Sequence, residues 1–371
     1  NKQSRHAVRS SRRRVNIKKL ETIVSEAKSS SFSLGTFSIA GSPAFPALVR
    51  KQEAVALTAL QPLAAQLGSH LLNAESMVGF LDGWTQNGKA LEALNTFLNH
   101  EAQGAKTWKA LAAPISALTT HAPIMPRQVF CCGANYFKHV VDLIVDQGPG
   151  ANPGTEGMDA VTLRKYAEDL MTRRKTTGAP YFFNKPVSSI TGPNDSIVLP
   201  GFAKKPDWEL ELAVVIGKSA RHVRRADALD YVAGYTIAND ISNRDWIWAR
   251  AEVKAMGTDW VAGKSCPTYL PLGPYIVPRR FVADPQDLKI TLKLNGEVKQ
   301  NESTSDMIFD VARQIEHLSS LVQLLPGDII CTGSPAGNGT HYNRFLQEGD
   351  LVESSISGLG SQHNPCVLER I

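Results

Sequence analysis

Short apolar or β-branched runs, most of them closed by turn residues, follow one another through the second half of the chain. They lie at Ser196–Leu199, Leu210–Ile216, Tyr231–Ala238, Leu272–Val277, Leu288–Leu294, Ile329–Cys331 and Leu351–Ile356. Runs of this length between turn residues are typical of β-strands, and Asn295-Gly296 has the sequence of a tight hairpin turn. Apolar residues at helical spacing predict one convincing helix, Met307–Leu324. The chain is therefore expected to have a β-rich fold of class α+β.

The length of 371 residues suggests about two or three domains. Residues 29–125 join short strand-like pieces to apolar residues at helical spacing, which predicts a smaller α/β N-terminal domain. Three prolines within residues 113–126 indicate a domain boundary. Residues 126–371 are then expected to form the larger, β-rich domain.

The positive net charge comes from one end of the chain. The formal charge is +5, but residues 1–28 hold nine Lys and Arg and two Glu, so the remainder is slightly acidic. A basic segment on a neutral body does not make a nucleic-acid-binding domain, and we expect residues 1–28 to be a flexible tail. No apolar run is long enough to span a membrane. Five cysteines without a CxxC pair predict a reducing compartment, and we expect a cytoplasmic location.

The strongest chemical signal is a pair of glutamates on a predicted strand. Glu209 and Glu211 are two positions apart, so their side chains point to the same face, about 7 Å apart at the backbone. Two neighbouring like charges repel unless one is protonated or a cation lies between them. The next strand ends at Asp240, which supplies a third carboxylate. Carboxylates without a nearby His or Cys favour Mg²⁺, then Mn²⁺ or Ca²⁺, although a solvent-facing amphipathic strand explains the spacing equally well.

Two further segments carry candidate catalytic groups. A helix beginning near Asn135 would place His139 and Asp142 on one side, where a carboxylate would orient an imidazole for general-base catalysis. Spacing alone favours a surface histidine with an incidental acidic neighbour. Lys264, in a Gly-Lys-Ser segment, could stabilise an oxyanion. A phosphate loop is excluded there because Thr258 stands where that motif requires glycine.

Taken in order, these segments resemble the C-terminal catalytic domain of the fumarylacetoacetate hydrolase family. The matching segments are Gly133–Tyr136 with His139, Lys185-Pro186 with Asn194-Asp195, Glu209–Gly217, Gly234–Asp245, Gly263–Ser265, Pro271–Pro274, Pro326–Ile330 and Thr332–Gly337. They cover residues 129–360, about two-thirds of the chain. The resemblance implies the family's mixed β-roll, here preceded by a smaller N-terminal domain, and a homodimer.

The resemblance also implies a role for each site residue. Glu209, Glu211 and Asp240 would match the family's Mg²⁺ ligands, and His139 with Asp142 its catalytic pair on a lid of about residues 135–180. Lys264 would line the metal pocket and stabilise the oxyanion. Contacts to substrate are expected from Tyr136, Lys185, Arg244, Thr332 and Ser334. Ala134, Ile247 and Cys266-Pro267 depart from the usual family residues in ways that remove polar groups, so the pocket is expected to favour a less charged substrate.

These implied roles predict a Mg²⁺-dependent hydrolase that cleaves a C–C bond in a β-diketone or acylpyruvate, as in the catabolism of aromatic compounds. His139 would activate the attacking water. An alternative on the same metal site is decarboxylation, isomerisation or dehydration of a 2-oxo acid, which needs an enolate but no attacking water. An alternative from another class is a non-catalytic binding or scaffold protein that keeps the fold.

Overall fold

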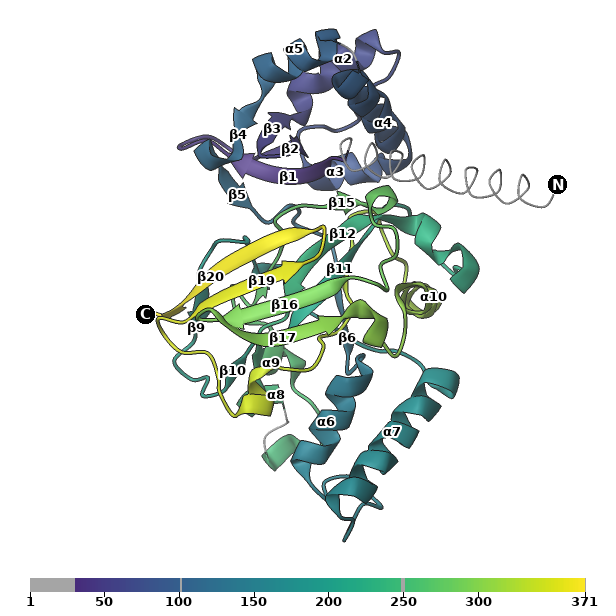
Figure 1. Ribbon diagram of the computed structural model, residues 1–371, viewed down its shortest axis with the longest axis vertical. Helices are drawn as coiled ribbons and strands as arrows, with labels where there is room; N and C mark the ends of the chain where they lie inside the picture. Colours follow the sequence, from purple (N-terminus) through teal and green to yellow (C-terminus); the bar gives the residue numbers. More distant parts are fainter. Residues whose placement is uncertain (1–30, 101, 248–250, 371) are drawn as a thin grey trace, which may run out of the picture.

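The computed structural model describes residues 31–100, 102–247 and 251–370 (Figure 1). The predicted basic tail, residues 1–28, lies outside the described residues. Mixed sheets with fewer helices confirm the predicted β-rich α+β class. None of the described helices is both long enough and apolar enough to cross a membrane.

A small unit of strands and helices lies at one end of the molecule (Figure 1). Its five-stranded sheet has the order β4-β3-β2-β1-β5, with helices after β3. The strands are β1 (Ser33–Ser38), β2 (Phe45–Arg50), β3 (Glu53–Ala56), β4 (Ala113–Pro114) and β5 (Thr119–His121). The helices are α2 (Gln61–Gln66), α3 (Met77–Asp82), α4 (Trp84–His100) and α5 (Ala102–Leu111).

The larger unit is built around two sheets. The central sheet has the order β15-β12-β11-β18-β6-β7, and a second sheet has the order β17-β16-β19-β20-β9. The first contains β6 (Val129–Gly133), β7 (Tyr181–Asn184), β11 (Leu210–Ile216), β12 (Val232–Asn239), β15 (Val277–Pro278) and β18 (Ile329–Cys331). The second contains β9 (Ile197–Leu199), β16 (Lys289–Leu294), β17 (Glu297–Ser303), β19 (Leu351–Ile356) and β20 (Gly360–Leu368). The predicted hairpin turn is confirmed, because Asn295 and Gly296 join β16 to β17 with φ of 54° and 81°.

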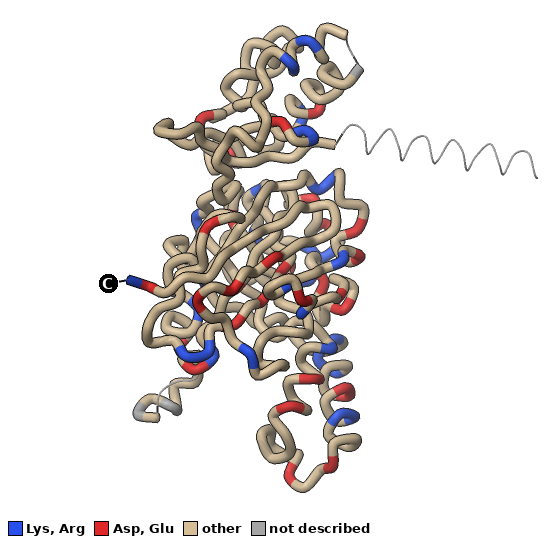
Figure 2. The backbone as a smooth tube through the Cα atoms, turned by 60° about the vertical axis from the view of Figure 1, so that its left-hand side comes forward, with Lys and Arg blue, Asp and Glu red and all other residues tan. Residues whose placement is uncertain are grey.

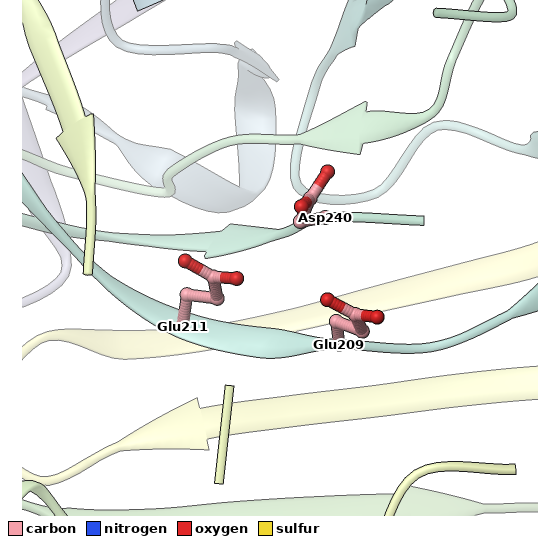
Figure 3. A group of neighbouring side chains, drawn as sticks. All are labelled: Glu209, Glu211 and Asp240. Carbon is pink, nitrogen blue, oxygen red and sulfur yellow. The ribbon is translucent and has the colours of Figure 1, made fainter. Parts of the chain in front are cut away.

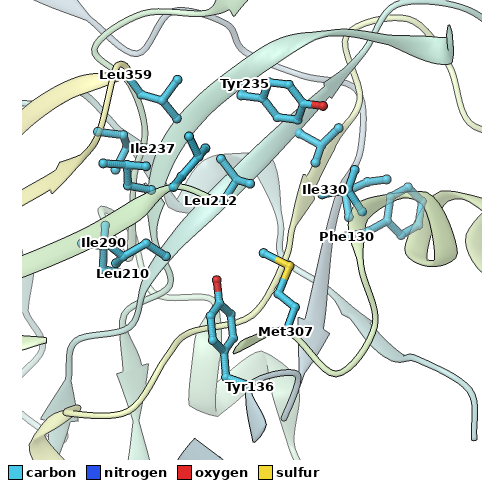
Figure 4. Packing of buried hydrophobic residues seen from close by; sticks show 14 of the residues in the cluster. Phe130, Tyr136, Leu210, Leu212, Tyr235, Ile237, Ile290, Met307, Ile330 and Leu359 are labelled. Carbon is cyan, nitrogen blue, oxygen red and sulfur yellow. The ribbon is translucent and has the colours of Figure 1, made fainter. Parts of the chain in front are cut away.

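Strand β11 is buried along its whole length, and its two faces serve different cores. Leu210 and Leu212 pack toward Ile290 of the second sheet, between the two sheets (Figure 4). Ala213 and Val215, on the opposite face, belong to an apolar cluster that also contains residues of the small unit. Glu211, Ala213 and Val215 alternate with the core residues of β11 and therefore point away from the inter-sheet core.

The small unit shares this second cluster with the larger one. Leu34 of β1 is fully buried, and its backbone exchanges two hydrogen bonds with Ile276, of 2.9 and 2.8 Å. Phe32, Leu81 and Ile329 lie in the same cluster. The two units therefore pack through a continuous apolar core rather than through a polar interface.

We expect Leu34→Ala to lower the free energy of unfolding by about 2–5 kcal/mol, because it leaves a cavity in this shared core. Denaturant unfolding of the purified protein measures the change. Ile39→Ala is the matched control, since Ile39 lies just beyond β1 and is 54% exposed. Equal effects of the two substitutions would contradict the shared core.

Two predicted elements differ from the structure. The predicted strand Leu272–Val277 is interrupted, because Gly273 has a φ of 116° and Pro274 has no N–H to donate; β14 (Leu270–Pro271) and β15 flank the break. The helix predicted at Met307–Leu324 is shorter, α10 (Val311–Leu321), because Asp310 caps it by accepting the Arg313 N–H at 2.7 Å.

Helices α6 (Phe137–Gln147) and α7 (Ala160–Thr177) form a hairpin that projects from the end opposite the small unit (Figure 1). Val141 and Ile144 of α6 pack against Leu163 and Met171 of α7 in an apolar cluster of their own. Acidic and basic residues are interspersed along this hairpin and over the main body (Figure 2). The hairpin occupies most of the segment predicted to be a lid.

Candidate active site

Three carboxylates converge at one end of the β11–β12 pair (Figure 3). Glu209 immediately precedes β11, Glu211 lies within it and Asp240 immediately follows β12. The Asp240 N–H donates to the Glu209 carbonyl at 2.8 Å, which brings the two ends together. One oxygen of each carboxylate lies within 4.8 Å of the others. Exposures of 9%, 1% and 1% show that the solvent-facing alternative was wrong.

Basic side chains neutralise two members of this carboxylate triad. Lys264 Nζ lies 2.6 Å from Asp240 Oδ2 and 3.0 Å from Glu209 Oε2, and Lys185 Nζ lies 2.5 Å from Asp240 Oδ1. Arg244 forms an ion pair with Glu209. Burial would raise the pKa of Glu209, but the charges of Arg244 and Lys264 outweigh it and hold that pKa at about 2. Glu209 is therefore ionised at any physiological pH.

Glu211 is in a different position. Its Oε2 accepts the Gly333 N–H at 2.7 Å, and no basic side chain of the described residues forms an ion pair with it. Burial, and then the charge of Asp240, raise the pKa of Glu211 well above its usual value. The three triad residues each offer one oxygen, and Glu211 has no basic partner among the described residues, so the group fits a hard divalent ion. The triad could hold a metal.

A fourth carboxylate, Asp207, positions residues of the site through hydrogen bonds. It is fully buried and accepts hydrogen bonds from Arg244 Nε at 2.8 Å, Gly339 N at 2.5 Å and Thr340 N at 3.1 Å. These contacts hold the Arg244 guanidinium against Glu209 and tie α11 (Gly339–Tyr342) to the site. Asp207 was not predicted as a site residue, although its alternation with Glu209 and Glu211 in the sequence was a usable signal.

A cavity of about 460 Å³ opens beside the triad. Its floor is polar, and its walls come from the β6–α6 turn, α6, β7 and α9 (Trp260–Lys264). The floor residues are Glu209, Asp240, Arg244, Lys264, Ser334 and Thr340. The wall residues are Cys132, Gly133, Ala134, His139, Leu143, Gln147, Tyr181, Phe183, Ile247, Thr258 and Trp260. This cavity is the space in which a substrate would meet the metal.

His139 lies on α6, is half-buried and lines the cavity. Burial lowers its pKa to about 4, so the imidazole is neutral at physiological pH and able to accept a proton. Asp142 accepts a hydrogen bond from Arg164 of α7 at 3.0 Å, which joins the two helices of the hairpin. The pairing of Asp142 with His139 stays a prediction.

The predicted substrate-binding residues fall into two groups. Arg244 and Ser334 line the cavity, and Lys185 reaches the triad through Asp240. Tyr136 and Thr332 are fully buried and are not among the lining residues: Tyr136 lies in the core near Met307 (Figure 4), and the Thr332 hydroxyl donates to the Leu212 carbonyl at 2.8 Å. Contacts of these residues to a substrate stay predictions.

Comparison with known proteins agrees with this arrangement. A family model described as "Fumarylacetoacetate (FAA) hydrolase C-terminal" matches residues 128–367, which include the triad, the cavity and both sheets of the larger unit. The chain belongs to the fumarylacetoacetate hydrolase family. The resemblance expected from the sequence is thereby confirmed. Members of this family are enzymes, and the chain retains the buried carboxylates and the cavity described above.

Relatives in the fumarylacetoacetate hydrolase family carry several activities in their names. The mitochondrial oxaloacetate tautomerase Fahd2a of Rattus norvegicus is 38% identical over 260 residues, which are 68% of this chain and 72% of that protein. A 2-hydroxyhepta-2,4-diene-1,7-dioate isomerase from Mycobacterium marinum has a TM-score of 0.60 at 28% identity, over 92% of this chain and all of that one. A fumarylacetoacetate hydrolase from Exiguobacterium antarcticum has a TM-score of 0.65 at 25% identity, over 91% and 100%.

Proposed function

We propose that this protein is a metal-dependent tautomerase of a 2-oxo acid. The observation that carries the proposal is that one cavity lies beside the buried carboxylate triad. Two of the triad's members, two basic side chains and a neutral histidine line that cavity. Tautomerisation needs a stabilised enolate and a group that moves a proton, and these residues are suited to both tasks. The name of the 38%-identical oxaloacetate tautomerase supports the same reaction class.

Glu209, Glu211 and Asp240 would hold the divalent cation, with Mg²⁺ first and Mn²⁺ or Ca²⁺ as alternatives. When bound, such an ion polarises the oxo and carboxylate oxygens of a 2-oxo acid. Lys264 and Arg244 line the floor and would orient these anionic oxygens. His139 would accept the proton from the carbon next to the carbonyl and return it to the oxygen. One C–H bond breaks and one O–H bond forms, so no further reactant is needed.

Hydrolysis of a C–C bond in a β-diketone or acylpyruvate is the second candidate. The volume of the cavity favours it, because about 460 Å³ exceeds what a four-carbon acid requires and leaves room for an attacking water. Decarboxylation or dehydration of a 2-oxo acid would use the same polar residues at the floor of the cavity. A scaffold without catalysis is disfavoured, because three carboxyl groups lie within 4.8 Å of one another beside a cavity, an arrangement that fits a metal site better than a packed core.

Product analysis separates these candidates. The purified protein is incubated with Mg²⁺ and a 2-oxo acid or acylpyruvate, in D₂O for exchange at the carbon next to the carbonyl and in H₂¹⁸O for hydrolysis. A tautomerase accelerates deuterium exchange and enol formation and leaves the carbon skeleton intact. Cleavage with ¹⁸O in a new carboxylate would identify a hydrolase instead. Absence of both with Mg²⁺ and Mn²⁺ would support the scaffold.

We infer a mitochondrial location from two observations. The relatives at 38% identity are named as mitochondrial proteins. Residues 1–28, with nine basic and two acidic residues, have the composition of a mitochondrial targeting segment. All five cysteines are free, which suits the cytoplasm and a reducing organelle alike. Fluorescent fusions with and without residues 1–28 test this, and an unchanged cytoplasmic signal would favour the location first expected.

The homodimer expected from the family resemblance is also a proposal. Light scattering after size-exclusion chromatography would give twice the chain mass of 40.3 kDa if it is correct.

A further inference from the structure

We propose that Tyr181, Phe183 and Trp260 form a subsite for a flat apolar group, so that the substrate is a 2-oxo acid carrying an aryl-type substituent. This inference rests on the proposed function and adds the class of substrate. The three side chains, called the aromatic wall below, all line the cavity beside the triad. They come from β7 and from the start of α9.

The side chains of the aromatic wall contact one another. The rings of Phe183 and Trp260 are stacked, with centroids 4.4 Å apart and planes within 6°. Trp260 Nε1 donates a hydrogen bond to the Tyr181 hydroxyl at 2.9 Å. Tyr181 and Phe183 are two positions apart on β7, so both point to the same face. Rings held in this way present apolar area with little loss of conformational entropy on binding.

The aromatic wall adjoins the polar floor of the cavity, where Phe183 lies next to Lys264. Lys264 Nζ lies 5.2 Å from the centroid of the Phe183 ring and 2.6 Å from Asp240 Oδ2. Trp260 and Lys264 are four positions apart on α9, on one side of that helix. A substrate whose oxo-acid end lies on the floor would therefore extend along the rings.

The charge of the lining residues points to the same substituent. Among the described residues that line the cavity, the only permanent cations are Arg244 and Lys264, and both are paired with carboxylates at the floor. The remaining wall includes Ala134, Leu143 and Ile247. Among these described residues, a second carboxylate on the substrate would meet no free cation, whereas an aryl group would meet the aromatic rings. This agrees with the less charged substrate expected from the sequence.

Three acids that differ only at the third carbon provide the test. Pyruvate carries hydrogen there, oxaloacetate a carboxylate and 3-phenylpyruvate a phenyl ring. Apparent equilibrium dissociation constants are measured by calorimetry with Mg²⁺ present, for the equilibrated keto–enol mixture of each acid. We expect 3-phenylpyruvate to bind at least tenfold more tightly than pyruvate, and oxaloacetate to gain less than threefold.

Two variants and a control assign the gain to the aromatic wall. Tyr181→Ala and Trp260→Leu are expected to weaken 3-phenylpyruvate binding about threefold to tenfold and to change pyruvate binding less than twofold. Phe202→Ala is the matched control, because Phe202 is 47% exposed, like Tyr181 at 46%, and does not line the cavity. Equal losses for both acids would mean that the rings only pack the fold and would overturn the inference. So would tightest binding of oxaloacetate.

Failure of the proposed function looks different from failure of this inference. If the phenyl group adds affinity through these rings but none of the three acids is tautomerised, the aromatic subsite stands and the tautomerase proposal fails. If enol formation is accelerated but the phenyl group adds no affinity, the tautomerase stands and the subsite is wrong.

Discussion

Glu211→Gln is expected to abolish binding of the divalent cation and to lower turnover about 10³-fold or more. A metal contributes several kcal/mol to a reaction of this kind, and each 1.4 kcal/mol corresponds to a factor of ten. Glu211 is the triad member without an ion-pair partner among the described residues, so its carboxyl group is the one most available to a cation. The glutamine carbonyl oxygen can still accept the Gly333 N–H, and the local fold should persist.

Thermal melting with and without Mg²⁺ or Mn²⁺ measures the first effect. Metal should raise the melting temperature of the natural protein and leave that of Glu211→Gln unchanged. In EDTA the variant should be about as stable as the natural protein, because the raised pKa of Glu211 favours its neutral carboxyl group without metal, and glutamine is neutral and similar in shape. Glu297→Gln, an exposed change on β17, is the control and should behave like the natural protein. An undiminished metal-dependent shift in Glu211→Gln would refute this role.

His139→Ala is expected to lower turnover about 10²- to 10⁴-fold and to retain metal binding. The imidazole lines the cavity and is neutral, with a pKa of about 4, so it is available as a base. It is not a member of the carboxylate triad, and the affinity for Mn²⁺ should change less than threefold. Steady-state kinetics and calorimetric titration with Mn²⁺ measure the two effects separately.

His363→Ala is the control for this substitution, since His363 is an exposed histidine on β20 and is not among the cavity residues. It should retain full activity. A fully active His139→Ala protein would remove the histidine from the mechanism. Loss of metal binding together with activity would assign His139 a structural or ligand role instead.

Local pattern was sufficient to predict much of the fold. Leu210–Ile216 was predicted with the bounds of β11, and the predicted Asn295-Gly296 turn joins β16 to β17. The interruption at Gly273-Pro274 was also a local signal, since proline cannot donate to a strand ladder. Alternation placed Glu209 and Glu211 on one face. It could not show whether that face was buried, because burial depends on packing partners far away in the sequence.

The missing parts of the site depend on long-range contacts. Trp260 meets Tyr181 across 79 positions, so the aromatic wall could not be recognised from spacing. Asp142 sits at the predicted spacing from His139, yet its carboxylate bonds to Arg164 on the next helix. Helical spacing shows which side chains share a face, and the arrangement of the second helix decides which of them pair.

A crystal structure of the protein grown with Mn²⁺, with an anomalous difference map calculated at the manganese edge, tests the metal site directly. We expect one strong peak, bounded by oxygens of Glu209, Glu211 and Asp240 and beside the cavity. A map without that peak, in which Lys264 still lies between Glu209 and Asp240 as the bridging cation, would contradict this expectation.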